Sequence, residues 1–388
     1  LTVGPLTGTT GIGATISHQG HAQFAGICTA TSFVPTVGQL SHRNVIINGD
    51  AKISQRATTQ GSITSGGYYA VDRWYVTMDT AGTWTMYQDA DVPSGYGFSK
   101  SVSLDVNTAN TSLSAGSRAM LSYRLEGQDV QRFCKGTANA KKYALSFWVK
   151  CGKTGTYVLE LFDHDNSRHI CKTYTISSAN TWEQKKLIFD NETSNAFAND
   201  NGKSLELQFY LAAGSNFTSG TLATSWASNT NANRAVGQVN VADSTSNKYF
   251  LTGVQLEVGP VVTPFEHRSF GDELRRCQRY YQRWKGHSDH NGIGPGRGNG
   301  SSGVFVSVNL MQCLRATPSI TNSGIVVFKA GASSTSTTNT PSLTNGSAFD
   351  DTSCIFPMNI TGLSGISNNQ GGYTVFLSSS DLRLDAEF

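Results

Sequence analysis

The sequence predicts an all-β protein of several sheets with one short helix. Charged residues make up 15% of the chain and 40 of its 388 residues are glycine, so the residues that cover long helices are under-used. Short runs of alternating apolar and polar residues, separated by turn clusters, are typical of β-sandwich strands. The length allows two or three domains, each with its own core.

Residues 1–42 have no hydrophobic period long enough to form a core. β-friendly pieces such as Ala14–Ser17 and Gln23–Ala25 are too short to be stable alone. We expect them to pair with copies of themselves in a multichain β shaft that serves for attachment. A disordered tether is the alternative.

Residues 43–268 are predicted to form the central β-sandwich. Tyr143–Cys151 shows the alternation, with Leu145, Phe147 and Val149 on one face and polar residues or Trp148 on the other. The predicted strands are Arg73–Asp79, Trp84–Asp89, Ser101–Val106, Arg118–Leu125, Tyr143–Cys151, Tyr157–Phe162, His169–Ile176, Trp182–Phe189, Leu205–Leu211 and Tyr249–Val258.

Residues 269–285 are predicted to form an amphipathic helix. Ser269 and Asp272 have the spacing of a capping box. One apolar stripe, which needs burial against the sandwich or near the axis of a trimer, consists of Phe270, Leu274, Cys277, Tyr281 and Trp284.

Residues 286–303 are glycine-rich and are predicted to form a flexible linker. Residues 304–388 return to short strands and form a second, smaller β domain. Its predicted strands are Val304–Asn309, Ile325–Lys329, Ile355–Ile360, Tyr373–Ser378 and Leu382–Phe388.

The net charge is +3 and the basic residues are dispersed, which argues against nucleic acid as a partner. The strongest basic cluster, Arg275 to Arg283, is interpreted as a solvated or salt-bridged surface, with phosphate or anionic glycan binding as the alternative. No apolar stretch is long enough to span a membrane and no signal peptide opens the chain. We therefore expect a soluble protein that is not inserted in a membrane.

The seven cysteines are scattered, without a CxxC motif. We interpret them as mostly free thiols, and a pairing of Cys151 with Cys171 across neighbouring strands stays open. His287 and His290 have a spacing that suits a metal but no further ligands nearby. The sequence therefore predicts no metal and no cofactor.

No catalytic residue is predicted. Asp163, His164 and Asp165 resemble the start of a calcium loop, but Arg168 and Tyr174 stand where glycine and an acid are needed, so we expect a hairpin turn. Phosphate-binding and nucleophile-elbow motifs are absent from the sequence. A glycosidase needs two facing carboxyl groups, and no clear pair is evident.

Aromatic residues outside the strands are the candidates for glycan binding, because a flat rigid ring covers the apolar face of a sugar at little entropic cost. Tyr68, Tyr69 and Trp226 lie in polar loops and are the candidates. The tryptophans of the strand runs are expected in the core.

Several motifs, in order, resemble a widespread family of phage tail-fibre and virion appendage proteins. They are Asn44–Gly49, Ser54–Arg56, Asp72–Trp74, Thr181–Glu183, Leu251–Gly259, Pro264–Arg268 and Cys277–Tyr281. Leu314–Pro318 and Leu384–Glu387 look like the C-terminal module of that family, and the stretch from Gly11 to Phe33 is similar to shaft segments of marine and cyanobacterial phage proteins.

The resemblance implies a jelly-roll domain like a carbohydrate-binding module, a homotrimer and a place on the virion. It implies no catalytic residue, and Asp72, Arg73, Trp74 and Trp182 are expected to be structural. The first hypothesis is a tail fibre or receptor-binding protein that attaches to host surface glycan and reaches other tail or head proteins through its N-terminal segment. The alternatives are a purely architectural capsid or tail fibre and a polysaccharide-cleaving tailspike.

Overall fold

The computed structural model describes residues 14–16, 22–24, 41–285, 291–330, 334–338, 342–345, 354–376 and 380–388. Within the N-terminal segment, Ala14–Ile16 (β1) pairs antiparallel with Ala22–Phe24 (β2). The rest of the predicted shaft lies outside the described residues, as do His287 and His290. No helix among the described residues is long and apolar enough to cross a membrane.

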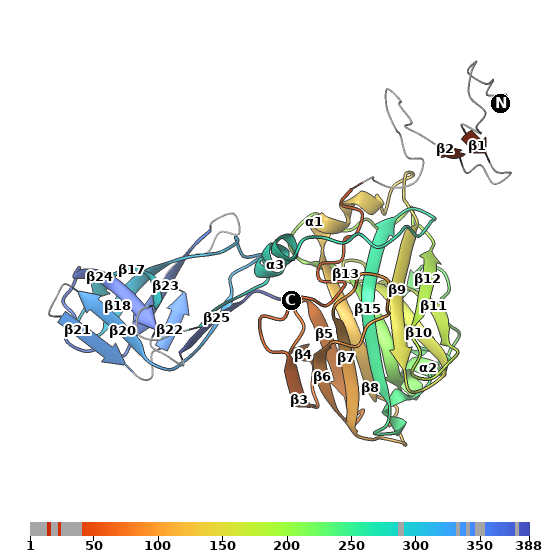
Figure 1. Cartoon of the computed structure of the whole chain (residues 1–388), viewed down its shortest axis with the longest axis horizontal. Helices are drawn as coiled ribbons and strands as arrows, with labels where there is room; N and C mark the ends of the chain where they lie inside the picture. Colours follow the sequence, from red (N-terminus) through yellow and green to blue (C-terminus); the bar gives the residue numbers. More distant parts are fainter. Residues whose placement is uncertain are drawn as a thin grey trace, which may run out of the picture.

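The central domain is a sandwich of two antiparallel sheets, as predicted (Figure 1). The seven-stranded sheet has the order β14 (Ala227–Ser228), β11 (Arg168–Ile176), β10 (Gly155–Asp163), β13 (Lys203–Ala213), β8 (Arg118–Glu126), β5 (Trp74–Asp79) and β4 (Gly67–Tyr68). The six-stranded sheet has the order β12 (Glu183–Phe189), β9 (Tyr143–Cys151), β15 (Lys248–Val258), β7 (Ser101–Thr108), β6 (Thr83–Asp89) and β3 (Thr59–Ile63).

The sandwich core follows the alternation read from the sequence. Leu145, Phe147 and Val149 of β9 are fully buried in it, together with Trp74 and Trp84. Short helical turns occupy the loops: α1 (Gly127–Val130), η1 (Gln131–Phe133), α2 (Ser215–Thr218), η2 (Asn231–Asn233) and η3 (Val241–Asp243). All ten predicted strands of this domain are confirmed, and residues 164–167 form the expected turn.

The predicted helix is shorter than the sequence indicated. Ser269 Oγ accepts the backbone N–H of Asp272 at 3.1 Å, which confirms the cap, but the helix (α3) spans Phe270–Gln278. Tyr281–Lys285 forms a strand instead (β16), paired with Asp381–Asp385 (β25). This pairing places five residues opposite β25 in an antiparallel ladder, and it splits the predicted stripe because residues 281 and 284 of a strand face opposite sides.

The prediction of a flexible linker in the glycine-rich stretch is wrong for its described residues. Asn291–Asn299 is not a flexible linker but a strand (β17) between β18 (Gly303–Asn309) and β24 (Gly371–Phe376). A Cβ on Gly294 would lie 2.0 Å from the carbonyl oxygen of Ser307, and one on Gly298 equally close to that of Ser367. Glycine is therefore needed here for close approach of neighbouring backbone.

The C-terminal domain has two sheets, and the first has the order β16, β25 and β19 (Ser319–Ser323). The second has the order β21 (Ser334–Thr338), β20 (Val326–Ala330), β24, β17, β18, β23 (Ile355–Thr361) and β22 (Ser342–Asn345). In Figure 1 this domain and the sandwich stand at opposite ends with α3 between them, and the C-terminus returns to the junction.

Four of the described cysteines are free, as the expectation of mostly free thiols has it, but two cysteines of this domain form a disulfide that the sequence did not predict. Cys313 follows β18 and Cys354 precedes β23, and the pairing of these strands brings the two sulfur atoms together. The pairing of Cys151 with Cys171 that the sequence left open does not occur, since both are free and buried.

The motifs that carry the family resemblance contact one another. The side chain of Asn44 bonds the backbone of Val254 and Leu256, and Trp74 Nε1 donates to the carbonyl of Asn48 at 3.1 Å. The fully buried Arg73 forms an ion pair with Glu387. The carboxylate of Asp72 accepts from the backbone N–H and the side chain of Gln55, so Asp72, Arg73 and Trp74 all hold the fold together, as expected.

Candidate functional site

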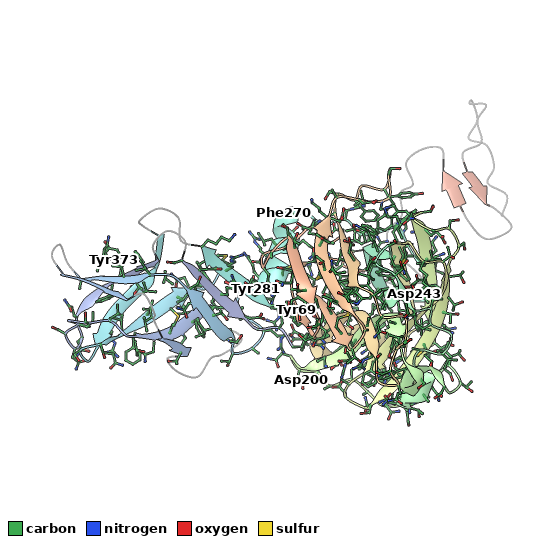
Figure 2. All side chains as sticks on the ribbon, turned by 90° about the horizontal axis from the view of Figure 1, so that it is seen from below. Tyr69, Asp200, Asp243, Phe270, Tyr281 and Tyr373 are labelled. Carbon is green, nitrogen blue, oxygen red and sulfur yellow. A yellow bond between two sulfur atoms is a disulfide. The ribbon has the colours of Figure 1, made fainter. Side chains whose placement is uncertain are left out.

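A cleft of about 340 Å³ lies where the sandwich meets the C-terminal domain. One wall is the β3–β4 edge of the sandwich, and the other is the three-stranded sheet β16-β25-β19. Figure 2 labels Tyr69 and Tyr281 at this junction. The cleft is lined by Arg56, Ala57, Gln60, Tyr68, Tyr69, Tyr281, Ser319, Thr321, Arg383 and Asp385.

The three-stranded sheet turns its polar face to the cleft. Asp385 lies between Tyr281 and Ser319 in the register, and Arg383 lies between Arg283 and Thr321. The intervening residues face the other way, where Leu382 and Leu384 enter the core of the C-terminal domain. Strand alternation therefore separates a hydrogen-bonding surface from an apolar one within five residues of β25.

Arg56 lines the cleft and contacts two of its other lining residues. Its guanidinium lies 3.8 Å from the ring centroid of Tyr281 and 2.8 Å from the carboxylate of Asp385. Burial opposes the charged form, but Glu387, Asp385 and Asp72 raise the pKa of Arg56 above its ordinary value. The side chain therefore stays charged, and its contacts with Tyr281 and Asp385 orient it.

The two predicted tyrosines have different roles. The Tyr68 hydroxyl is buried, with no hydrogen-bond partner among the described residues, and burial raises the pKa of this phenol. Tyr69 is half-buried, and its hydroxyl donates to the carbonyl of Ser65 at 2.9 Å, which orients the ring. Tyr69 is therefore the better stacking platform, and Tyr68 supports the wall.

Tyr281 belongs to the cleft rather than to an apolar stripe. Its hydroxyl is buried without a hydrogen-bond partner among the described residues. Burial raises the pKa of Tyr281 to about 12, although the arginines around it act in the opposite direction. The phenol is therefore neutral at physiological pH and can donate a hydrogen bond.

The accessible groups of the cleft suit a polyhydroxylated ligand. Gln60, Ser319 and Thr321 are exposed, and the side chains of Arg383 and Asp385 are 42% and 34% accessible. These groups supply donors and acceptors beside an aromatic ring, on strands that hold their spacing. Neighbouring sugar hydroxyls are recognised by this combination.

Trp226 does not join this site. It precedes β14, which is the edge of the seven-stranded sheet opposite to β4. Its Nε1 donates to the carbonyl of Asp190 at 2.8 Å, and Lys135 Nζ lies 5.1 Å from its ring centroid. The three predicted aromatics therefore lie at two ends of one sheet.

Two other tryptophans are less buried than expected. Trp148 and Trp182 lie on the outer face of the six-stranded sheet, not in the core. Tyr96, which is 54% exposed, packs on Trp148 with ring centroids 4.3 Å apart. Trp182 Nε1 donates to Asp91 at 2.8 Å. The side chains of Lys150 and Gln184 share this outer face, because strand alternation brings them to it.

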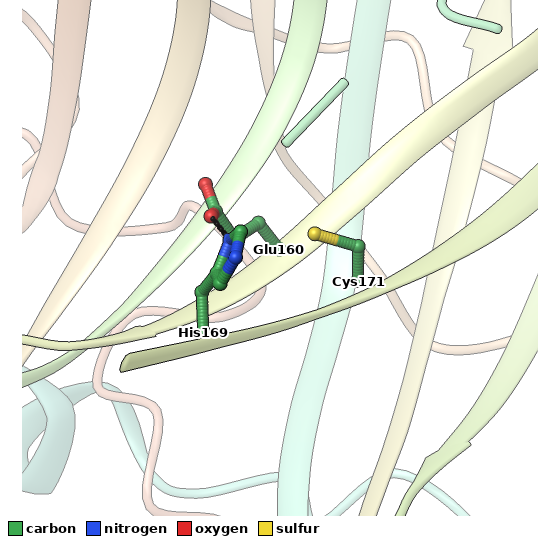
Figure 3. Close-up of side chains that lie close together, drawn as sticks. All are labelled: Glu160, His169 and Cys171. Carbon is green, nitrogen blue, oxygen red and sulfur yellow. Dashed lines mark hydrogen bonds and ion pairs between the residues drawn. The ribbon is translucent and has the colours of Figure 1, made fainter. Parts of the chain in front are cut away.

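Glu160, His169 and Cys171 gather three atoms that could hold a metal, within 4.8 Å of one another (Figure 3). His169 Nδ1 lies 2.7 Å from Glu160, and Arg234 Nε lies 3.0 Å from both oxygens of the same carboxylate. Burial alone would raise the pKa of Glu160, but His169 and Arg234 lower it. Because the guanidinium already neutralises the carboxylate, the cluster is a buried ion-pair network.

The residues predicted for helix packing or a trimer axis are separated in the structure. Cys277 and Leu274 pack against the sandwich core of the same chain, and Trp284 packs against the core of the C-terminal domain. Phe270 is 60% exposed. Of the predicted stripe, Phe270 is therefore the most exposed residue, whereas Leu274 and Trp284 are half-buried.

Sequence reasoning missed the C-terminal contribution to the cleft. Arg383 and Asp385 reach Arg56 and Tyr281 only through the pairing of β25 with β16, about a hundred residues earlier in the chain. The alternation of charged and leucine residues in β25 is a strand signal, but it does not reveal the partner.

No protein-family model and no curated protein sequence matches the chain. Among solved structures, it is similar to the enzymatically active domain of tailspike protein 4 of bacteriophage CBA120, with 16% identity, a TM-score of 0.30 and coverage of 55% of this chain and 21% of that one. The chain thus spans about a fifth of that structure's length.

The chain is also similar to a putative sugar-binding protein from Bacteroides thetaiotaomicron, with 12% identity, a TM-score of 0.30 and coverage of 56% and 100%. A third structure, TmCBM61 in complex with β-1,4-galactotriose, has 10% identity, a TM-score of 0.29 and coverage of 56% and 99%. At these identities and TM-scores the similarity carries no conclusion about function.

Proposed function

We propose that this protein is a non-enzymatic, carbohydrate-binding attachment protein of a phage virion. The observation that carries glycan binding is the cleft, where Tyr69 lies beside Gln60, Thr321, Arg383 and Asp385. A sugar ring stacks on Tyr69 while its hydroxyls bond the polar face of β25 and β19. The virion assignment is supported by the motifs shared with tail-fibre proteins.

The acidic residues of the cleft favour binding over cleavage. Asp385 is the one acid among the described residues that line it, and its carboxylate is bonded to Arg56 at 2.8 Å. Glycoside hydrolysis needs two carboxyl groups in defined roles. Incubation with host polysaccharide should therefore release no new reducing ends, and their appearance would assign the protein to the tailspike enzymes.

A homotrimeric fibre would make a shallow cleft sufficient, since three weak sites per fibre bind together with high avidity. We expect a trimer in mass photometry of the full chain. Cryo-electron microscopy of intact particles, which places the density on the tail or on the head, separates the receptor-binding role from an architectural one.

The glycan-binding role is tested on an array of bacterial surface glycans with the purified chain. Tyr69→Ala should weaken the strongest signal at least ~10-fold, equivalent to about 1.4 kcal/mol. Tyr373→Ala is the matched control, because Tyr373 is 48% exposed on the C-terminal domain (Figure 2). Absence of any glycan signal, in a protein that also fails to block phage adsorption, would overturn the proposal.

A further inference from the structure

A second hollow lies around α3. Two adjoining depressions of about 250 and 510 Å³ share His42 and Arg276 in their linings. Arg132, from η1, lines the smaller one, and Arg275, from α3, lines the larger. We call this hollow the arginine pocket.

Three of the neighbouring carboxylates, those of Glu126, Glu266 and Asp272, contact other groups. Glu126 holds Arg279 through two bonds of 2.9 and 3.0 Å. Glu266 accepts the backbone N–H of Asn44 at 3.0 Å and lies 3.5 Å from Arg268. Asp272 accepts the hydroxyl of Ser269 at 2.7 Å.

Two guanidinium groups are left over. Arg275 and Arg276 have no carboxylate within 4.0 Å among the described residues, and the contact of Arg276 there is His42 Nδ1 at 3.5 Å. Residues 1–40, which precede the pocket in the chain, contain no Asp or Glu. That segment therefore has no side-chain carboxylate with which to neutralise them.

The local potential is positive at the shared wall. Burial and the guanidinium groups of Arg268 and Arg276 lower the pKa of Arg132, although Asp129 acts in the opposite direction. Burial and Glu126 raise the pKa of Asp129, so the charge of this carboxyl is itself disfavoured. An oxyanion between these arginines would relieve their repulsion.

We propose that the arginine pocket binds the anionic group of a small ligand, a carboxylate or a phosphate. Guanidinium groups match the geometry of both, because each offers parallel N–H donors to two oxygens. The pocket and the glycan cleft have no lining residue in common among the described residues. Anion binding is therefore independent of the glycan-binding function.

The test is isothermal titration of the full chain, at about 50 mM salt, with inorganic phosphate and separately with trigalacturonate. At least one should bind, and more weakly as salt rises. Binding of phosphate alone assigns the pocket to phosphate groups, and binding of trigalacturonate alone assigns it to acidic saccharides. Each ligand is titrated to ~20 mM, which is 20-fold above a dissociation constant of about 1 mM. Absence of binding heat from both ligands at that concentration would overturn the proposal.

The site is located with Arg275→Gln/Arg276→Gln, which should weaken binding at least ~10-fold. Lys186→Gln/Lys329→Gln removes the same charge from strands of the two domains distant from α3, and should leave affinity unchanged. Equal affinity of the wild type and the arginine variant would contradict the assignment. If the double variant unfolds early, Arg275→Gln alone gives the same comparison, since Arg275 is exposed.

Discussion

The sandwich and the C-terminal domain achieve stability differently. The sandwich closes one continuous core between its two sheets, with Trp74, Trp84 and Phe147 fully buried. The C-terminal domain has a smaller core, a disulfide and a tail that leaves it. That tail ends against the sandwich, where Glu387 meets Arg73. The comparison shows that the cleft depends on the junction between the domains rather than on either domain alone.

The largest effect is expected from the buried ion pair of the junction. Arg73→Met removes the nearer of the two cations that pair with the buried Glu387 and leaves Arg56 at 3.7 Å, which should cost up to about 3–5 kcal/mol of unfolding free energy. Urea denaturation measures this loss. Arg118→Met breaks a surface pair with Asp79 and should cost at most ~1 kcal/mol. Equal losses in the two variants would show that the tail does not join the domains.

Acid should destabilise the sandwich. Burial alone would raise the pKa of Glu206, but the hydrogen bond with His164 and the charge of Arg124 lower it to about 2. Because the folded-state pKa lies below the unfolded value, its stabilisation is full above about pH 4.5 and disappears as pH falls towards 2. The loss, on the order of 3 kcal/mol, should appear in melting curves across this range and be smaller in Glu206→Gln. An identical acid response of the variant would contradict it.

Removal of the disulfide should affect the C-terminal domain. Cys313→Ser/Cys354→Ser opens a link across 41 residues, which should cost about 2–4 kcal/mol of stability. Hydrogen exchange should show the loss in β18 and β23 and leave β9 and β15 protected. Uniform loss of protection would mean that the two domains unfold as one unit.

The sandwich was predictable because its signals are local. Tyr143–Cys151 alternates over a full strand, and the structure has the same bounds. The helix α3 was only half predictable. The spacing of Tyr281 and Trp284 fits a helical stripe, but the pairing of these residues with β25 makes them part of a strand. At these positions, strand pairing in the folded protein overrides the local helix propensity.

The cleft was predictable only through its aromatic wall. Tyr68 and Tyr69 stood out because they lie in a polar, glycine-flanked stretch. Arg383 and Asp385 come from the far end of the chain, and no local pattern relates them to Arg56. The strand β17 was missed because glycine is read as a loop residue, although here it allows close backbone packing.

The most direct test of the account asks whether glycan binds in the cleft at the junction. Thr321→Trp places an indole in the cleft from an exposed strand position, and Thr317→Trp places one at an exposed position outside its lining. Titration with the glycan that gives the strongest array signal should show binding at least ~10-fold weaker for Thr321→Trp, about 1.4 kcal/mol, and unchanged for Thr317→Trp. Equal affinity of both variants and the wild type would contradict the central claim.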